Sequence, residues 1–163
     1  MTYFTEWDAP EGHFKAGSIK RASSSNDKVW AEINKTNVDL LAGTFVAVNA
    51  AGGVKRIAAA TDVVHGIVMR TVFGDSIPNT EPTDVGHFSH GDEVVALCDD
   101  DAEFTRGSKV YIVATAGANA GKITNVAVGN IATNYYVTEL STGNKTAAIT
   151  LGFAQAVTAA QGG

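Results

Sequence analysis

The chain has 163 residues and a mass of 16.9 kDa; 45% of its residues are hydrophobic and 18% are charged. This composition excludes a disordered or collagen-like chain, and the length suits one domain with a core of its own. The net charge is −5 at pH 7, and basic residues never form a run longer than a pair. A basic surface that follows nucleic-acid phosphates is therefore not expected.

Residues 1–28 are expected to form an extended arm. Glycine, proline and serine interrupt any periodicity there, yet Tyr3, Phe4, Trp7 and Phe14 are concentrated in this segment. Exposed aromatic side chains of this kind commonly supply binding energy at interfaces. The alternative is an N-terminal strand that folds onto the core of its own chain.

The start of the chain lacks the basic and apolar regions of an export signal, and no stretch approaches the ~20 apolar residues of a membrane span. We therefore expect a protein that is made and kept in a cytosol. The single cysteine, Cys98, ends an apolar run and is expected to be a small buried hydrophobe.

The remaining residues, 29–163, are predicted to form an all-β body. The pattern from Asp27 to Leu41 fits either a short helix or a strand, and we favour strand or irregular structure. After Ala42, β-branched runs alternate with glycine-rich turns, which predicts short strands in a sandwich or small barrel. The expected strand segments are Phe45–Val48, Val63–Val64, Ile67–Val68, Val94–Leu97, Val110–Val113, Tyr135–Val137 and Ala147–Ile149.

A weak internal repeat divides this body into two related β-units. Residues 43–48 and 107–112 each begin with a glycine and a small hydroxyl residue and continue as a strand. A glycine-rich turn follows in both cases. Between the units, residues 74–91 contain Pro78 and Pro82 and few apolar residues, and they are predicted to form a long loop.

Several candidate sites lack the spacing that their chemistry requires. The turn at 117–122 departs from the phosphate-binding pattern GxxxxGK[ST], and Asp99, Asp100 and Asp101 lack the spacing of a calcium loop. His87, His90 and Glu93 would converge on a helix, but a glycine and a strand interrupt them. No nucleophile, histidine and acid occur in a recognisable turn. We therefore expect no catalytic, cofactor-binding or metal site.

Short motifs in chain order resemble tailed-phage capsid decoration proteins, also called structural cement proteins. The motifs are Ala16–Ile19, Gly43–Val48, Gly66–Val68, Gly91–Val94, Gly107–Tyr111 and Gly152–Ala156. The resemblance implies a small β-rich virion protein, made in the host cytoplasm, that binds the major capsid protein on the capsid exterior. It also implies self-association, as a trimer more often than a dimer, and it carries over no catalytic residue. Charge and hydropathy separately predict no nucleic-acid or membrane partner.

The aromatic residues of the first part of the chain are the expected interface with the capsid or a neighbouring subunit: Tyr3, Phe4, Trp7, Phe14 and Trp30. The main alternative is a virion-associated module that binds a ligand or sugar, and a small β-barrel hydrolase is a third. A sugar binder would place exposed aromatic residues on a loop platform, whereas Trp7 and Trp30 both precede the main strands.

Overall fold

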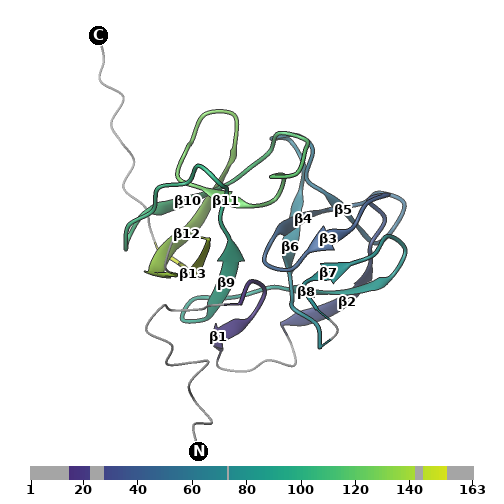
Figure 1. Cartoon of the computed structure of the whole chain (residues 1–163), viewed down its shortest axis with the longest axis horizontal. Helices are drawn as coiled ribbons and strands as arrows, with labels where there is room; N and C mark the ends of the chain where they lie inside the picture. Colours follow the sequence, from purple (N-terminus) through teal and green to yellow (C-terminus); the bar gives the residue numbers. More distant parts are fainter. Residues whose placement is uncertain (1–14, 23–27, 73, 142–144, 154–163) are drawn as a thin grey trace, which may run out of the picture.

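The computed structural model describes residues 15–22, 28–72, 74–141 and 145–153. These residues form strands and turns without any helix, which confirms the predicted all-β class. Figure 1 shows the strands as two groups that lie side by side. Within the described part of the chain there is accordingly no helix of the length and hydropathy needed to cross a membrane.

The first group is an antiparallel five-stranded sheet with the strand order β2-β8-β6-β4-β5. Its strands are β2 (Val29–Ile33), β4 (Phe45–Val48), β5 (Val54–Arg56), β6 (Val64–Val68) and β8 (Pro82–Gly86). Strands β3 (Leu40–Leu41) and β7 (Ser76–Ile77) pair with each other as a separate two-stranded sheet. A single parallel bridge between Asn34 and Val54 brings the two outer strands of the five-stranded sheet together.

The second group is an antiparallel six-stranded sheet with the order β1-β9-β13-β12-β10-β11. Its strands are β1 (Ile19–Arg21), β9 (Glu93–Leu97), β10 (Lys109–Ile112), β11 (Ile123–Thr124), β12 (Ile131–Leu140) and β13 (Thr146–Leu151). A parallel bridge connects Cys98, directly after β9, to Ile123 in β11. Both sheets are therefore curled, because a bridge brings strands from their opposite sides together.

The two sheets are copies of one topology, apart from β1. The order β9-β13-β12-β10-β11 matches β2-β8-β6-β4-β5 strand for strand. Equivalent backbone bonds also recur: Gly43 N donates to Val68 O at 2.8 Å, and Gly107 N donates to Val137 O at 2.7 Å. The two related β-units predicted from the glycine motifs are therefore confirmed. In each unit a single bridge connects the two outer strands, and the described strands form open sheets. Of the two predicted architectures, a sandwich therefore describes the body better than a barrel.

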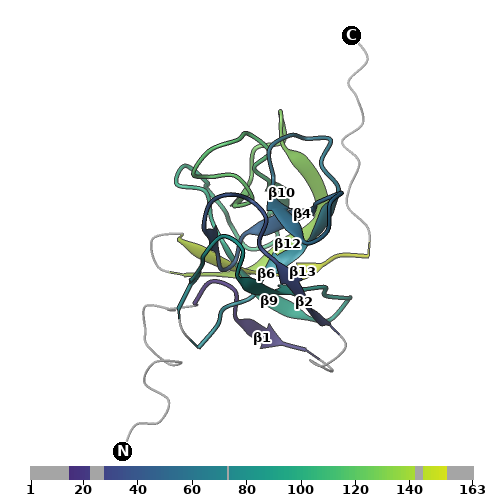
Figure 2. The same ribbon diagram turned by 90° about the vertical axis from the view of Figure 1, so that its right-hand side faces the viewer.

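One large core joins the units, and a smaller one lies inside the first. Phe45, Ala47 and Ile67 from the first unit share the large core with Val94, Val137 and Ile149 from the second. The smaller core consists of Leu40, Val46, Val54, Val68, Ile77 and Val85. Figure 2 looks at the molecule from the side of the first unit, so that β4 and β6 overlap strands of the second unit in this view.

Two predicted boundaries were wrong. Residues 19–21 were assigned to the arm, but they form β1 and pair with β9, with Ile19 opposite Val94. Residues 74–91 were predicted as a loop, but they contain β7 and β8. Pro82 gave the misleading signal, because proline is compatible with the first position of a strand. Residues 1–14 lie outside the described residues.

Two adjacent glycines offer a matched test of how the first sheet curls. Gly52 and Gly53 have φ angles of 93° and 71°, so alanine at either position costs roughly 1–2 kcal/mol of backbone strain. A Cβ at Gly52 would meet only Lys35 Nζ at 3.9 Å, whereas at Gly53 it would overlap the carbonyl oxygen of Ile33.

We therefore expect Gly53→Ala to lower the free energy of unfolding by about 3 kcal/mol or more, since the Asn34–Val54 bridge must shift as well. Gly52→Ala should cost only the strain. Urea denaturation of both variants measures the difference, and equal losses would contradict this account of the bridge.

Candidate interaction surface

Trp30 is the only one of the predicted interface residues that lies in the described part of the chain. It lies on β2, an edge strand of its sheet, and 51% of its surface is exposed. Tyr3, Phe4, Trp7 and Phe14 fall outside the described residues, so their role stays a prediction. An indole this exposed retains about half of its surface for a contact with another molecule.

Two histidines support the Trp30 ring. The ring centroids of Trp30 and His87 are 4.1 Å apart with an interplanar angle of 34°, and His65 lies 5.6 Å from Trp30. The His65 and His87 rings meet edge to face at 4.8 Å. His65 Nε2 also lies 3.1 Å from Glu32 Oε1. The exposed indole therefore rests on an aromatic base that limits its rotamers.

His87 is the residue of this cluster whose hydrogen-bonding groups lack partners. Both of its ring nitrogens are buried and have no hydrogen-bond partner among the described residues. Burial lowers the pKa of His87 from 6.5, and the neighbouring His65 lowers it further, against smaller opposing effects from Lys28 and Glu32. A buried donor and acceptor without partners are uncommon in folded proteins, and they mark this cluster as a place where stability is not optimised.

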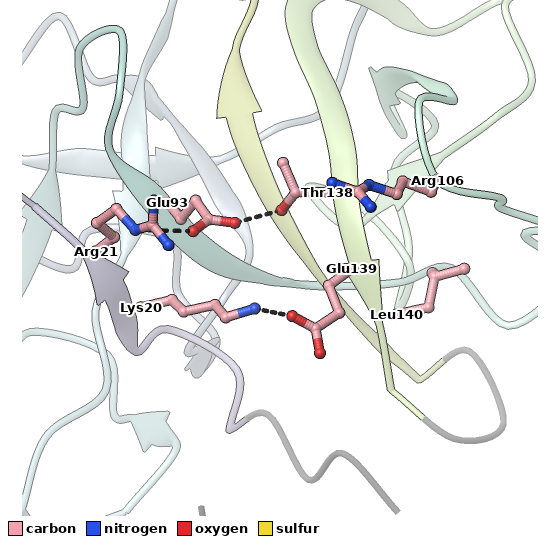
Figure 3. Close-up of a pocket in the computed structure, with 7 residues that line it drawn as sticks. All are labelled: Lys20, Arg21, Glu93, Arg106, Thr138, Glu139 and Leu140. Atoms are coloured by element: carbon pink, nitrogen blue, oxygen red, sulfur yellow. Dashed lines mark hydrogen bonds and ion pairs between the residues drawn. The ribbon is translucent and has the colours of Figure 1, made fainter.

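A polar pocket of about 420 Å³ is lined by residues of β1, β9 and β12, and Figure 3 shows these side chains. Its lining is mostly charged and consists of Lys20, Arg21, Glu93, Arg106, Thr138, Glu139 and Leu140. Lys20 pairs with Glu139, Arg21 Nε lies 3.5 Å from Glu93, and Thr138 donates to Glu93 at 2.6 Å. These contacts join β1 to the second unit, so we interpret the pocket as a structural polar network.

The metal candidates from the sequence do not converge. His87 lies under Trp30, whereas His90 stacks on Phe153 at 4.4 Å and Glu93 contacts Thr138. Among the described residues no group of three or more histidine, cysteine or acidic side chains could hold a metal ion. Asp100 forms its ion pair with Lys122, at 3.4 Å.

Cys98 is buried, as predicted, with 3% of its surface exposed. Burial raises the pKa of its thiol to about 12, with a smaller contribution from Asp99. The thiolate that a nucleophilic cysteine needs is therefore strongly disfavoured.

The turn at residues 117–122, whose sequence departs from the phosphate-binding pattern, directs Lys122 toward Asn119 and Asp100.

The arrangement defines a class of protein: a scaffold whose described residues form only strands and turns, with an exposed tryptophan at a sheet edge. The chain belongs to the XM1 gp53 minor capsid protein family, whose model matches residues 4–151. It is thus a structural protein of a phage virion that associates with the capsid.

A solved structure, the capsid of Myoviridae phage XM1, contains a chain with the same fold. The TM-score is 0.67 at 22% sequence identity, and the match covers 86% of this chain and 91% of that chain. No curated protein matches this sequence.

The His87 cluster leads to a prediction about pH. Because the folded protein lowers the pKa of His87, the unfolded chain binds this proton more readily once the pH falls below 6.5. The free energy of unfolding should therefore decrease as the pH falls below about 6.5. His87→Phe, which keeps a ring beneath Trp30, should reduce this dependence.

Denaturant melts across that pH range measure the slope. His90→Phe is the control, because it removes an exposed histidine elsewhere in the fold. An equal change of slope in both variants would show that His87 has no special part in it.

Proposed function

We propose that this chain is a decoration protein that binds the outer surface of a phage capsid and stabilises it. The observation that carries the proposal is the exposed, ring-supported Trp30 at an open sheet edge of a minor capsid family member. A cement protein has to offer apolar contact area while it folds independently, and the two cores leave this indole available for such contact.

Charge supports an exterior position. The chain has a net charge of −5, which disfavours contact with packaged DNA on the inner side of a shell. Repeated capsid subunits also present equivalent sites around local symmetry axes, which favours a symmetric oligomer. We propose self-association as a trimer in preference to a dimer, with the major capsid protein as the other partner.

The N-terminal arm is the second part of the proposed interface, through Tyr3, Phe4, Trp7 and Phe14. Burial of Tyr3, Phe4 and Trp7, at ~150–250 Å² each and ~25 cal/mol per Å², gives on the order of 11–19 kcal/mol. Ordering about ten backbone residues costs roughly 10–20 kcal/mol. One arm therefore gains little by itself, and retention on the particle depends on several arms that engage together.

The function is tested by adding purified protein to capsids that lack it. We expect co-sedimentation with the particles, extra density on the outer surface in cryo-electron microscopy, and greater resistance of the shell to heat. Density on the inner surface, or binding without any gain in shell stability, would contradict the proposal.

Removal of residues 1–12 should separate binding from folding. We expect the truncated protein to keep the β body with little change in melting temperature, and to be retained on particles at least tenfold less well. Trp30→Ala should also weaken retention, whereas Val128→Ala, at a residue 89% exposed between β11 and β12 of the second unit, serves as the control.

Two results would contradict this assignment of the interface. A truncated protein that fails to fold would make the arm part of the core. Wild-type retention of both the truncated protein and Trp30→Ala would place the interface elsewhere.

A further inference from the structure

The internal repeat pairs each residue of β2 with a residue of β9. Trp30 lies opposite Val85 in the first sheet, as Val94 lies opposite Ile149 in the second. The bridges at Asn34 and Cys98 fall in the same register. Trp30 is therefore equivalent to Val94, and Ala31 is equivalent to Val95.

The two equivalent strands differ in what covers their outer edges. In the second unit, β1 and the turn before it lie beside β9. Val95 N donates to Ser18 O at 2.9 Å, and Gly17 N donates to Val95 O at 2.8 Å. Val94 is 0% exposed and belongs to the large core, whereas its equivalent Trp30 is 51% exposed.

The outer edge of β2 has the same hydrogen-bonding direction, but no strand in the described part of the chain pairs with it. Asn34 N donates to Glu81 O at 3.0 Å, and His87 N donates to Lys28 O at 2.6 Å, so the even-numbered residues face β8. In an antiparallel ladder the intervening residues, Val29, Ala31 and Ile33, then direct their N–H and C=O groups away from β8.

One end of this edge is closed. Lys35 N donates to Val54 O at 2.9 Å, and the Ile33 carbonyl lies against Gly53. The open stretch is therefore Val29 to Ala31, and Ala31 is exposed. Among the described residues no strand other than β8 pairs with β2.

We propose that the open edge of β2 accepts the N-terminal segment, residues 1–14, of a second copy of this chain as an added strand. The inference rests on the proposed oligomer and names the contact that forms it. The added strand would take the place beside Ala31 that the Gly17–Ser18 turn and β1 take beside Val95. Two copies then become linked through backbone hydrogen bonds, a mode known as β-augmentation.

Three features of the segment fit this role. The strand that covers β9 also comes from the N-terminal part of the chain, directly after this segment. Thr2, Tyr3, Phe4 and Thr5 form a run of strand-favouring residues. Fourteen residues span up to about 46 Å when extended, enough to cross to a neighbouring molecule.

Side-chain chemistry fits as well. A strand beside β2 places its side chains next to Trp30, and cross-strand aromatic pairs are among the more stabilising ones. Tyr3, Phe4 and Trp7 supply such partners. The base of the segment is held at β9 by β1, so an arm that reaches β2 of a neighbour leaves both sheets of its own body intact.

Disulfide trapping in mixed samples tests the contact. One variant carries Ala31→Cys and the other carries a cysteine at one position from Thr2 to Trp7, introduced one position at a time. The native Cys98 is buried with a raised pKa, so it contributes little background. We expect a disulfide between the two different chains, on capsids and in concentrated solution, with a preference for alternate arm positions.

A matched pair of substitutions tests the backbone bonds. Ala31→Pro removes an outward N–H and leaves the ladder to β8 intact, whereas Ala31→Val keeps the N–H. We expect Ala31→Pro to weaken association between copies at least tenfold and Ala31→Val to retain it. Circular dichroism and melting temperature confirm that both variants fold, and combining Ala31→Pro with removal of residues 1–12 should add no further loss.

The outcomes separate this inference from the proposed function. A disulfide that forms only when both cysteines lie in one chain would show that the arm covers its own edge, and would overturn the inference. Wild-type association of Ala31→Pro would also overturn it. Failure of the wild-type protein to bind capsids would instead count against the decoration function.

Discussion

Strand β4 lies between the two cores, with Phe45 and Ala47 facing the larger one and Val46 facing the smaller. A strand buried on both faces has to be apolar throughout and has to satisfy its backbone within the protein. It pairs with β5 and β6, and Phe45 N donates to Gly121 O of the second unit at 2.7 Å. The two curled sheets are thus held together around this strand.

Comparison of the two repeated units shows that their outer sheet edges differ. Two copies of one topology would leave two equivalent open edges, yet β1 covers β9 and the polar network of Lys20, Arg21, Glu93 and Glu139 holds it there. The equivalent edge of β2 keeps an exposed tryptophan. Open edges invite pairing with other chains, and natural proteins usually block them. An edge left open in a capsid protein is therefore a natural place for a partner.

The histidine cluster beneath Trp30 is less stable than the site would allow. His87 keeps two buried ring nitrogens without partners among the described residues, where a carbon ring of similar shape would pack without that penalty. Places where local rules are broken tend to be functional, because function constrains them independently of folding. The conflict therefore supports the proposal that this edge contacts another molecule.

The sequence by itself determined the all-β class, the two related units and the buried Cys98, because β-branched runs and glycine turns are local signals. It did not reveal β8, whose alternation of exposed and buried residues begins at a proline, or the pairing of β1 with β9. It singled out Trp30 but did not place His65 and His87 beside it, since nothing in the spacing of these residues indicates that strands β2, β6 and β8 are neighbours. Only tertiary structure decided which edge stayed open, because strand order depends on contacts between residues far apart in the chain.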